Sequence, residues 1–267
     1  MIKLAVIGKD VSQSTSPQIH GFIAENLGFE ISYGKISVPE EEFERKIEEL
    51  LDGYDGLNVT IPYKLSVIPH LKKVEGDALA FGAVNTVLTA TRTGYNTDGL
   101  GFMQMLESAK IGAAGAKVLL LGAGGAGRSV AKKLSDAGAY VDIYDRNFTN
   151  AESVAAQFAS VSALKEVAPK KRKLIVNATG VGMHKTEGLS PVGAEIIEGC
   201  EVAVDLIYVP EKSEFLRIAE DLGKKIINGR AMLFYQAYYS DCIYFGLNPS
   251  PEIAAKLFKK YLKEVVK

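Results

Sequence analysis

Residues that hold small secreted or metal-bound domains together are scarce in this sequence. It contains two cysteines, three histidines and no tryptophan among 267 residues. Cys200 and Cys242 lie outside any CxxC motif, and no Cys/His cluster has the spacing of a zinc site. The sequence therefore predicts neither a disulfide framework nor a metal site, and its cysteine usage is typical of a reducing cytoplasm.

Long apolar runs and an excess of charge of one sign are missing as well. No apolar run approaches the roughly 18 to 20 residues of a membrane helix, and the first apolar stretch is too short for a signal peptide. The 31 basic and 32 acidic side chains leave a net charge of -1, which gives no broad basic surface for nucleic acid. The basic run 170–173 predicts a solvated turn. We expect a cytoplasmic globular protein, a monomer or homodimer, that binds a small molecule and neither nucleic acid nor membrane.

Short apolar runs alternate with longer helical patterns along the whole chain. This alternation predicts an α/β fold of βαβ units with parallel sheets, and the pattern occurs twice. Helices are expected at 17–27, 40–51, 98–109, 151–159 and 212–222, and through most of 230–267 with an interruption at 246–251. Strands are expected at 2–7, 31–38, 57–61 and 84–90 in the first part, and at 117–121, 140–144, 174–177, 202–207 and 225–228 in the second.

A glycine-rich loop follows the first strand of the second part and precedes a helix that ends near Gly138. In this context the first glycine permits a tight turn, the second lets the backbone approach a pyrophosphate, and the last lets the helix pack closely on the strand. The pattern predicts a dinucleotide site formed by Gly122, Ala123, Gly124, Gly125, Ala126 and Gly127.

The end of the next strand, Asp145-Arg146-Asn147, bears on the choice of dinucleotide. A carboxylate at this position accepts hydrogen bonds from the ribose of NAD, whereas an arginine pairs with the additional phosphate of NADP. Both residues are present, and Asp145 would repel the phosphate that Arg146 attracts unless it turns away. From the residues alone the cofactor preference stays open.

Three polar clusters follow predicted strands of the first part, where open α/β sheets bind their ligands. Ser14 and Ser16 stand beside a helix start, so their hydroxyls suit a carboxylate and equally suit a simple helix cap. Lys64 lies in the second cluster, residues 58–64, and Asp98 lies in the third, residues 95–98. Hydride transfer to a ketone creates an alkoxide that needs a proton, and a lysine held by a carboxylate supplies one, although such residues are most often surface charges.

Eight motifs between Ser14 and Gln236, nearly the whole chain, share one resemblance. They are Ser-Thr-Ser-Pro at 14–17, Gly-Leu-Asn-Val-Thr-Ile-Pro-Tyr-Lys at 56–64, Gly-Ala-Val-Asn-Thr at 82–86, Asn-Thr-Asp-Gly at 96–99, the glycine loop, Asn-Ala-Thr-Gly-Val-Gly-Met at 177–183, Asp-Leu-Ile-Tyr-Val-Pro at 205–210, and Gly-Arg-Ala-Met-Leu-Phe-Tyr-Gln-Ala at 229–237. In this combination the chain resembles the shikimate dehydrogenase family, whose members reduce 3-dehydroshikimate to shikimate with a nicotinamide cofactor.

The resemblance implies a reversible, NADP-dependent oxidoreductase of aromatic amino-acid (chorismate) biosynthesis that needs no metal. It implies that Lys64 and Asp98 are the catalytic acid/base pair. The substrate-binding residues that it implies are Ser14, Ser16, Asn58, Thr60, Asn85 and Gln236. Beyond the glycine loop, the implied cofactor-binding residues are Asp145, Arg146, Asn147, Thr179, Gly180, Met183, Tyr208 and Gly229.

The chain departs from the family pattern at three places. Most members carry Asn-Arg-Thr at the ribose position, so Asp145 and Asn147 weaken the implied preference for NADP. Gln13 replaces the histidine of the usual His-Ser-x-Ser-Pro, and Gly180 replaces a serine. An NAD-using quinate/shikimate dehydrogenase and a non-catalytic shikimate- or dinucleotide-sensing module remain alternatives.

The patterns and the resemblance together predict two domains. We expect an N-terminal α/β substrate domain made of residues 1–99 and 230–267, to which the C-terminal helices return. A Rossmann-like dinucleotide-binding domain is expected at 100–229, with the nicotinamide reaching the substrate across the cleft between the domains.

Overall fold

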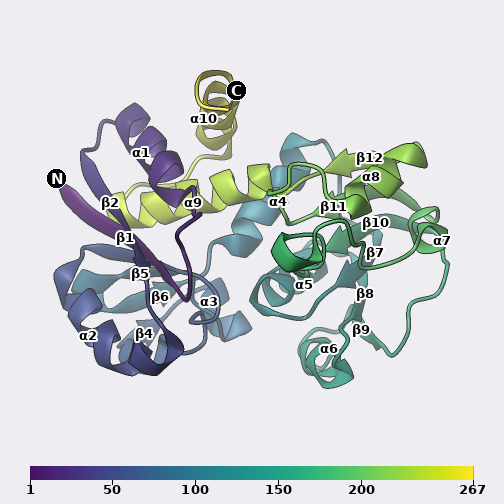
Figure 1. The fold of residues 1–267 in the computed structure, drawn as a ribbon, viewed down its shortest axis with the longest axis horizontal. Helices are drawn as coiled ribbons and strands as arrows, with labels where there is room; N and C mark the ends of the chain where they lie inside the picture. Colours follow the sequence, from purple (N-terminus) through teal and green to yellow (C-terminus); the bar gives the residue numbers. More distant parts are fainter. Residues whose placement is uncertain (267) are drawn as a thin grey trace. The chain divides into compact units, whose positions relative to one another are not determined.

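A computed structural model describes residues 1–266 of the chain (Figure 1). The chain forms two compact units: unit 1 is Met1–Gln104 with the segment from Phe234 onward, and unit 2 is Met105–Leu233. Most of helix α9, Arg230–Phe245, belongs to unit 1, and helix α10, Pro251–Glu264, packs on helix α1, Ser16–Leu27. The predicted return of the C-terminal helices to the first part of the chain is confirmed.

Unit 1 contains a six-stranded sheet whose strands run in both directions. Its strands are β1 Ile2–Gly8, β2 Ile31–Ser37, β3 Gly56–Val59, β4 Lys73–Val74, β5 Thr86–Leu88 and β6 Thr93–Tyr95, in the order β2-β1-β3-β5-β6-β4. Strand β1 is parallel to β2 and β3, but β5 is antiparallel to both β3 and β6. The expectation of a parallel sheet is wrong here, because only a short turn joins β5 to β6 and a parallel connection needs a crossover of a dozen residues or more.

The helices of unit 1 follow the predicted pattern with local differences. Besides α1, α9 and α10, they are α2 Phe43–Gly53, α3 Asp77–Phe81 and the greater part of α4 Asp98–Ser108, with 3-10 turns at Glu40–Glu42, Ile68–His70 and Thr89–Thr91. The predicted strand 57–61 ends at Val59, before Pro62, which has no N–H for a sheet hydrogen bond. The predicted helix 40–51 begins as a 3-10 turn, and the predicted strand 84–90 is limited to Thr86–Leu88.

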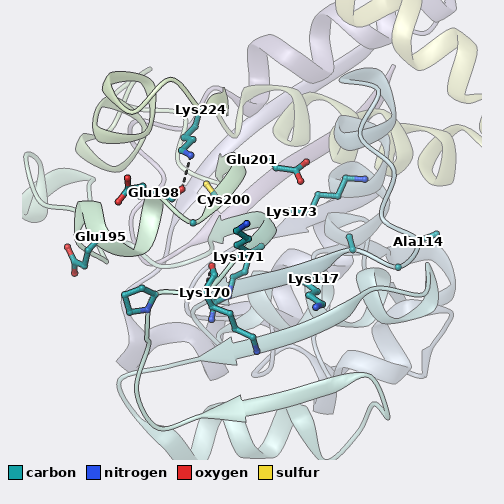
Figure 2. Close-up of a pocket in the computed structure, with 15 residues that line it drawn as sticks. Ala114, Lys117, Lys170, Lys171, Lys173, Glu195, Glu198, Cys200, Glu201 and Lys224 are labelled. Atoms are coloured by element: carbon teal, nitrogen blue, oxygen red, sulfur yellow. Dashed lines mark hydrogen bonds between the residues drawn. The ribbon is translucent and has the colours of Figure 1, made fainter.

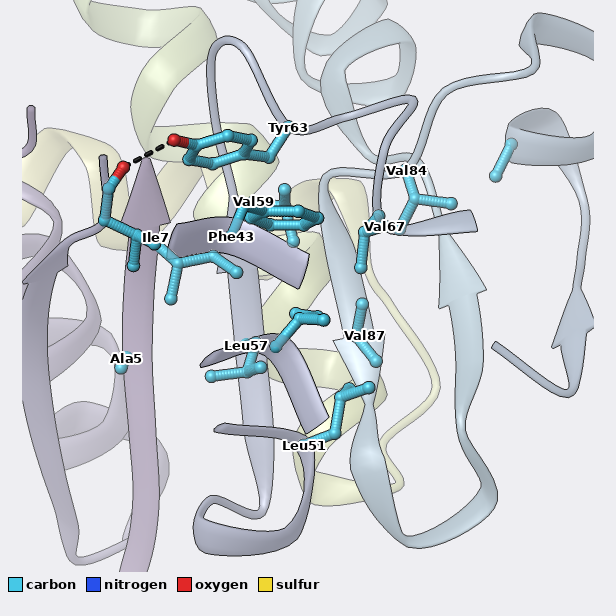
Figure 3. Packing of buried hydrophobic residues seen from close by; sticks show 13 residues of the cluster. Ala5, Ile7, Phe43, Leu51, Leu57, Val59, Tyr63, Val67, Val84 and Val87 are labelled. Atoms are coloured by element: carbon cyan, nitrogen blue, oxygen red, sulfur yellow. Dashed lines mark hydrogen bonds between the residues drawn. The ribbon is translucent and has the colours of Figure 1, made fainter. Parts of the chain in front are cut away.

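The core of unit 1 anchors the segment that carries Lys64. Helix α2 packs its apolar face, which includes Phe43, against β1 and β3 (Figure 3). The Tyr63 ring stacks on Phe43 at 4.2 Å, and its hydroxyl donates to the carbonyl oxygen of Val38 at 2.5 Å. The Val84 N–H donates to the carbonyl oxygen of Lys64 at 2.7 Å. The preceding residue Tyr63 and the carbonyl group of Lys64 are therefore held in place, and the Lys64 side chain is the part that is available for chemistry.

Unit 2 is a doubly wound α/β layer with an entirely parallel sheet, as predicted. Its strands are β7 Lys117–Leu121, β8 Tyr140–Tyr144, β9 Val161–Leu164, β10 Arg172–Asn177, β11 Cys200–Asp205 and β12 Lys225–Ile227. The order β12-β11-β10-β7-β8-β9 reverses direction between β7 and β10. Open α/β sheets bind ligands outside the carboxyl ends of the strands at such a switch point, and β7 leads there into the glycine loop.

The helices of unit 2 are short. They are α5 Gly125–Asp136, α6 Phe148–Ala155, α7 Ala194–Ile197 and α8 Glu214–Asp221, with a 3-10 turn at His184–Thr186. The predicted helix 151–159 starts earlier, because the Asn147 side chain accepts from the Thr149 N–H and caps α6 there. Throughout residues 1–266, every helix is too short or too polar to cross a membrane.

Candidate active site

Lys64 and Asp98, 34 positions apart in the chain, form a direct ion pair in unit 1. Lys64 lies in the turn after β3, and Asp98 is the first residue of α4. Lys64 Nζ donates to Asp98 Oδ2 at 2.5 Å, and the two side chains are only 16% and 9% exposed. The Asp98 N–H donates to the Asn96 side chain at 3.1 Å. The ammonium group is thus held at a defined point, and the lysine side chain is not completely buried.

Asn85 connects this ion pair to helix α9. Its Oδ1 accepts from the Thr97 N–H at 2.9 Å, which fixes the amide orientation because a backbone N–H can only donate. Its Nδ2 therefore faces the other side, where it donates to Asp98 Oδ1 at 2.8 Å and lies 3.4 Å from Gln236 Oε1. Both oxygens of Asp98 are hydrogen-bonded, so the carboxylate serves as a rigid acceptor for Lys64.

The remaining predicted substrate residues lie in the same unit. Ser14 Oγ is 3.0 Å from Ser16 Oγ and accepts from the Ser16 N–H, so the two hydroxyls stand together at the start of α1. Asn58, in β3, donates to the Asn85 carbonyl oxygen at 3.3 Å. Thr60 turns its methyl group toward Gly8, where a Cβ would approach it within 2.6 Å. The structure brings Asn58, Lys64, Asn85, Asp98 and Gln236 into one hydrogen-bonded cluster. Thr60 is fixed by its backbone, whose N–H donates to the Ile7 carbonyl oxygen at 2.9 Å.

Three residues of this cluster are absent from the sequence prediction. Ser240 Oγ lies 2.7 Å from Thr86 Oγ1 and 3.1 Å from Thr97 Oγ1, and it accepts from Asn58 Nδ2 at 3.2 Å. Ser240 follows Gln236 by one helical turn on α9, a spacing that puts both on one face of the helix. That spacing is the signal that would have identified it. Thr86 and Thr97 lie within the motifs 82–86 and 96–99, but neither is among the residues to which the resemblance assigns a role.

The glycine loop of unit 2 has the backbone of a phosphate cradle. Gly122 has φ +100°, which suits glycine, and a Cβ on Gly127 would lie 2.1 Å from the Gly122 carbonyl oxygen. A Cβ on Gly124 would meet nothing within 4 Å, so this face of the loop is open. Helix α5 begins at Gly125 without a side-chain cap, which leaves its first N–H groups available. The loop therefore fits a dinucleotide pyrophosphate.

Asp145 turns toward the glycine loop. Its Oδ2 accepts from the Ala123 N–H at 2.9 Å, and its Oδ1 accepts from the Asn147 N–H at 2.9 Å. Arg146 is exposed, and in residues 1–266 it forms no ion pair. Both carboxylate oxygens of Asp145 therefore accept from backbone N–H groups, which directs the side chain toward the glycine loop and the Asn147 backbone.

The other predicted cofactor residues lie in segments after β10, β11 and β12. Asn177 Oδ1 accepts from the N–H and the hydroxyl of Thr179, at 3.0 and 2.6 Å, and so shapes the loop that carries Gly180 and Met183. The Gly229 N–H donates to the Ile207 carbonyl oxygen at 2.9 Å, which brings it beside the segment of Tyr208. The three segments meet at the carboxyl edge of the parallel sheet.

Asp205, fully buried, ties two of these segments together. Its Oδ1 accepts from Asn177 Nδ2 and from the Ile207 N–H, both at 3.0 Å, and its Oδ2 accepts from the Ser213 hydroxyl at 2.5 Å. Burial raises the pKa of Asp205 to about 6, and its three hydrogen bonds offset only part of that rise. The sequence motif contains this residue, but nothing in the pattern indicates that its carboxyl group is buried.

Asp205 should make the stability of the protein depend on pH. Because the folded pKa of about 6 lies above the ordinary 3.8, the folded state binds the proton more tightly, so this contribution to stability is full below pH 3.8 and is lost as pH rises through 6. Relative to Asp205→Asn, the wild type should lose about 2 kcal/mol of unfolding free energy between pH 4 and pH 7. Urea unfolding of both proteins at the two pH values measures this, and an equal difference at both would contradict it.

A cavity of about 820 Å³ lies at the opposite end of the unit 2 sheet (Figure 2). Its walls include the first residues of β7, β10 and β11, which are Lys117, Arg172 and Cys200. Lys170 and Lys171 are exposed, as predicted for a solvated turn, whereas Arg172 is buried and donates to backbone carbonyl oxygens. Because parallel sheets bind nucleotides at the carboxyl ends of their strands, this cavity is separate from the nucleotide site.

Comparison with known proteins identifies both units. Residues 6–87 match the family described as "Shikimate dehydrogenase substrate binding domain", and residues 105–181 match "Shikimate / quinate 5-dehydrogenase". Two curated relatives named shikimate dehydrogenase (NADP(+)) are 38% identical, from a strain of Thermus thermophilus, and 35% identical, from Carboxydothermus hydrogenoformans. Each alignment covers 94% of this chain, with 95% and 94% of the respective relative.

A solved structure gives the same result. The crystal structure of a Thermus thermophilus shikimate 5-dehydrogenase, in complex with NADP(H) and shikimate, superposes with a TM-score of 0.86 at 37% identity. The match covers 97% of this chain and 99% of that one. Since the similarity extends over both units and over nearly the full length of each relative, the chain belongs to the shikimate dehydrogenase family.

Proposed function

We propose that this protein is a cytoplasmic shikimate dehydrogenase of aromatic amino-acid (chorismate) biosynthesis, which reduces 3-dehydroshikimate to shikimate reversibly with NADP. The observation that carries the proposal is the ion pair of Lys64 and Asp98, held by Asn85, in a chain of this family. A lysine held against a carboxylate, with its side chain not completely buried, suits proton transfer to a bound alkoxide.

The hydrogen-bonded cluster of unit 1 binds the substrate together with Ser14 and Ser16. Ser14 and Ser16 hold the carboxylate with their adjacent hydroxyls. Asn85, Asp98 and Gln236 bind the ring hydroxyls, for which their amide and carboxylate groups offer both donors and acceptors. Asn58 and Thr60 line the same pocket. A site with so many paired polar groups disfavours a substrate that lacks the matching hydroxyls.

Lys64 transfers the proton. In the reducing direction its Nζ donates a proton to the oxygen that gains negative charge, and in the oxidising direction neutral Lys64 removes the hydroxyl proton. The positive charge of Lys64 stabilises the developing oxyanion without a metal ion. Asp98 keeps the ammonium group in place. The nicotinamide cofactor, when bound, supplies or accepts the hydride.

The cofactor-binding residues belong to unit 2. The glycine loop and the first N–H groups of α5 bind the pyrophosphate. Arg146 pairs with the phosphate on the adenosine ribose, while Asp145 and Asn147 shape the backbone around it. Thr179, Gly180, Met183, Tyr208 and Gly229 line the nicotinamide side. The curated relatives are named for NADP(+), which agrees with an exposed arginine at the ribose position.

A spectrophotometric assay tests the proposal. Shikimate with NADP+ should produce reduced cofactor, which absorbs in the near ultraviolet. Faster turnover with NAD+ or with quinate would favour an NAD-using quinate/shikimate dehydrogenase. Binding of shikimate or NADP+ without any reduced cofactor would favour a sensing module, and the proposed function would then be wrong.

A further inference from the structure

The cavity at the amino ends of the unit 2 strands is strongly basic, and the proposed mechanism does not use it (Figure 2). Six of its fifteen lining residues are basic and three are acidic, whereas the whole chain has a net charge of -1. The basic residues are Lys117, Lys170, Lys171, Arg172, Lys173 and Lys224. Its volume of about 820 Å³ is typical of sites for small molecules. Positive charge concentrated in a concave site attracts anions.

Half of these basic residues have no partner within the protein. Two lysines are engaged: Lys170 Nζ is 3.4 Å from Asp142 Oδ2, and Lys224 Nζ donates to the Glu198 carbonyl oxygen at 2.7 Å. Three others form no hydrogen bond or ion pair with any residue in the described range 1–266, and these are Lys117, Lys171 and Lys173. Their ammonium groups are therefore available to a ligand.

Two of the available lysines are neighbours on adjacent strands. In the parallel pair of β7 and β10, Leu174 lies opposite Val118, so the preceding residues Lys173 and Lys117 stand side by side on one face of the sheet. Like charges in this position repel and destabilise the sheet. Glu201 occupies the same level of β11, yet no ion pair joins it to Lys173 in the part of the chain that the structure describes. An anion bound at the two ammonium groups would remove the repulsion.

The loop that carries Lys170 and Lys171 is fixed by buried contacts. The Arg172 side chain is only 3% exposed, and it donates to the carbonyl oxygens of Ala168 and Lys170 at 3.2 and 3.4 Å. The Arg172 N–H donates to the Gly199 carbonyl oxygen at 2.9 Å. A Cβ on Gly199 would lie 2.4 Å from the Lys170 carbonyl oxygen, so the close approach of the two segments requires glycine. The cavity is thus preformed, which lowers the ordering cost of binding a ligand.

We propose that this cavity binds a small molecule with two or more phosphate groups, through the ammonium groups of Lys117, Lys171 and Lys173. Ammonium groups form strong, charge-assisted hydrogen bonds with phosphate oxygens. Glu195 and Glu198 border the cavity on the side away from Lys117 and Lys173 (Figure 2). Their negative charges repel a polyanion that extends beyond the lysines, so a compact ligand fits better than nucleic acid. The site lies at the opposite end of the sheet from the glycine loop, and its ligand is distinct from the dinucleotide of the proposed function.

Calorimetric titration with inorganic tripolyphosphate tests the proposal, with NADP+ at saturation so that the proposed dinucleotide site is occupied. The wild type should bind one tripolyphosphate per chain, and more weakly as the salt concentration rises. The triple variant Lys117→Gln/Lys171→Gln/Lys173→Gln should raise the dissociation constant about 10- to 100-fold. The single variant Lys171→Gln, in the exposed loop, should raise it about threefold even if the triple variant folds poorly.

The matched control is Lys256→Gln/Lys259→Gln/Lys263→Gln, which removes the same charge from exposed positions of α10 in unit 1. It should leave the dissociation constant within about twofold of the wild type. Equal weakening in both triple variants would show a response to net charge alone and would overturn the proposal, as would a wild type that binds no tripolyphosphate. Tighter binding of a single-stranded oligonucleotide would also overturn it. None of the substituted lysines has a role in the proposed function, so a chain that failed to oxidise shikimate would leave this comparison intact.

Discussion

Replacing Lys64 by methionine should lower kcat for shikimate oxidation about 1000-fold and change KM by less than about threefold. Methionine matches most of the length of lysine and packs against the same neighbours, but it carries no proton and no charge. Asp98 keeps its bond from Asn85, and the backbone of residue 64 keeps the bond from the Val84 N–H, so the pocket retains its shape. The loss is therefore chemical. Initial rates with saturating NADP+ measure it.

A matched control separates this effect from the loss of any ion pair in unit 1. Lys46 of α2 forms a similar ion pair with Glu42, 2.5 Å long, and belongs to the helix rather than to the hydrogen-bonded cluster that contains Lys64. Lys46→Met should leave kcat within about twofold of the wild type. If Lys64→Met turned over shikimate at the wild-type rate, Lys64 could not be the proton carrier.

Much of the fold of unit 2 is readable from the sequence because its strands are buried on both faces. Runs such as Leu174–Asn177 are apolar at nearly every position, and the structure places strands at every one of the five predicted runs. The edge strand β9, Val161–Leu164, escapes prediction, because one of its four residues is buried and its pattern resembles a loop.

Unit 1 is harder to predict because strand direction leaves no trace in the apolar pattern. A run such as Thr86–Leu88 has the same composition whether it pairs parallel or antiparallel. The two-residue strand Lys73–Val74 is too short to produce any periodicity. The residues that decide the direction are those of the tight turn before β6, where Arg92 adopts a positive φ of 50°.

The candidate site, like the fold, can be predicted from the sequence only in part. Motifs identify Lys64 and Asp98, whose pairing across 34 positions the structure then displays. Ser240 belongs to no motif, since it matters only through the partners that the fold brings to it. Asp205 is part of a sequence motif, but its burial and its raised pKa depend on the segments that meet around it. Sequence patterns reveal residues with a fixed chemical task, whereas supporting residues become visible only with the contacts.

The choice between NADP and NAD should depend on Arg146. Asp145 already accepts from the N–H groups of Ala123 and Asn147, which leaves its carboxylate fewer lone pairs for the two ribose hydroxyls of NAD. Arg146 is exposed and, within the described part of the chain, is not engaged by an acidic side chain. A guanidinium group in this state favours a phosphate, with which it forms strong charge-assisted hydrogen bonds.

Arg146→Leu should therefore raise KM for NADP+ about 10- to 100-fold and leave KM for NAD+ within about twofold. The effect on NADP+ should shrink at high ionic strength, because the lost contact is between exposed charges. Arg217→Leu is the control: it removes an arginine of unit 2 that pairs with Glu214 and Asp221 on α8. Steady-state kinetics with both cofactors distinguish the cases. An equal rise for NADP+ and NAD+ would show that Arg146 supports the loop rather than the phosphate, and the preference for NADP would then need another cation.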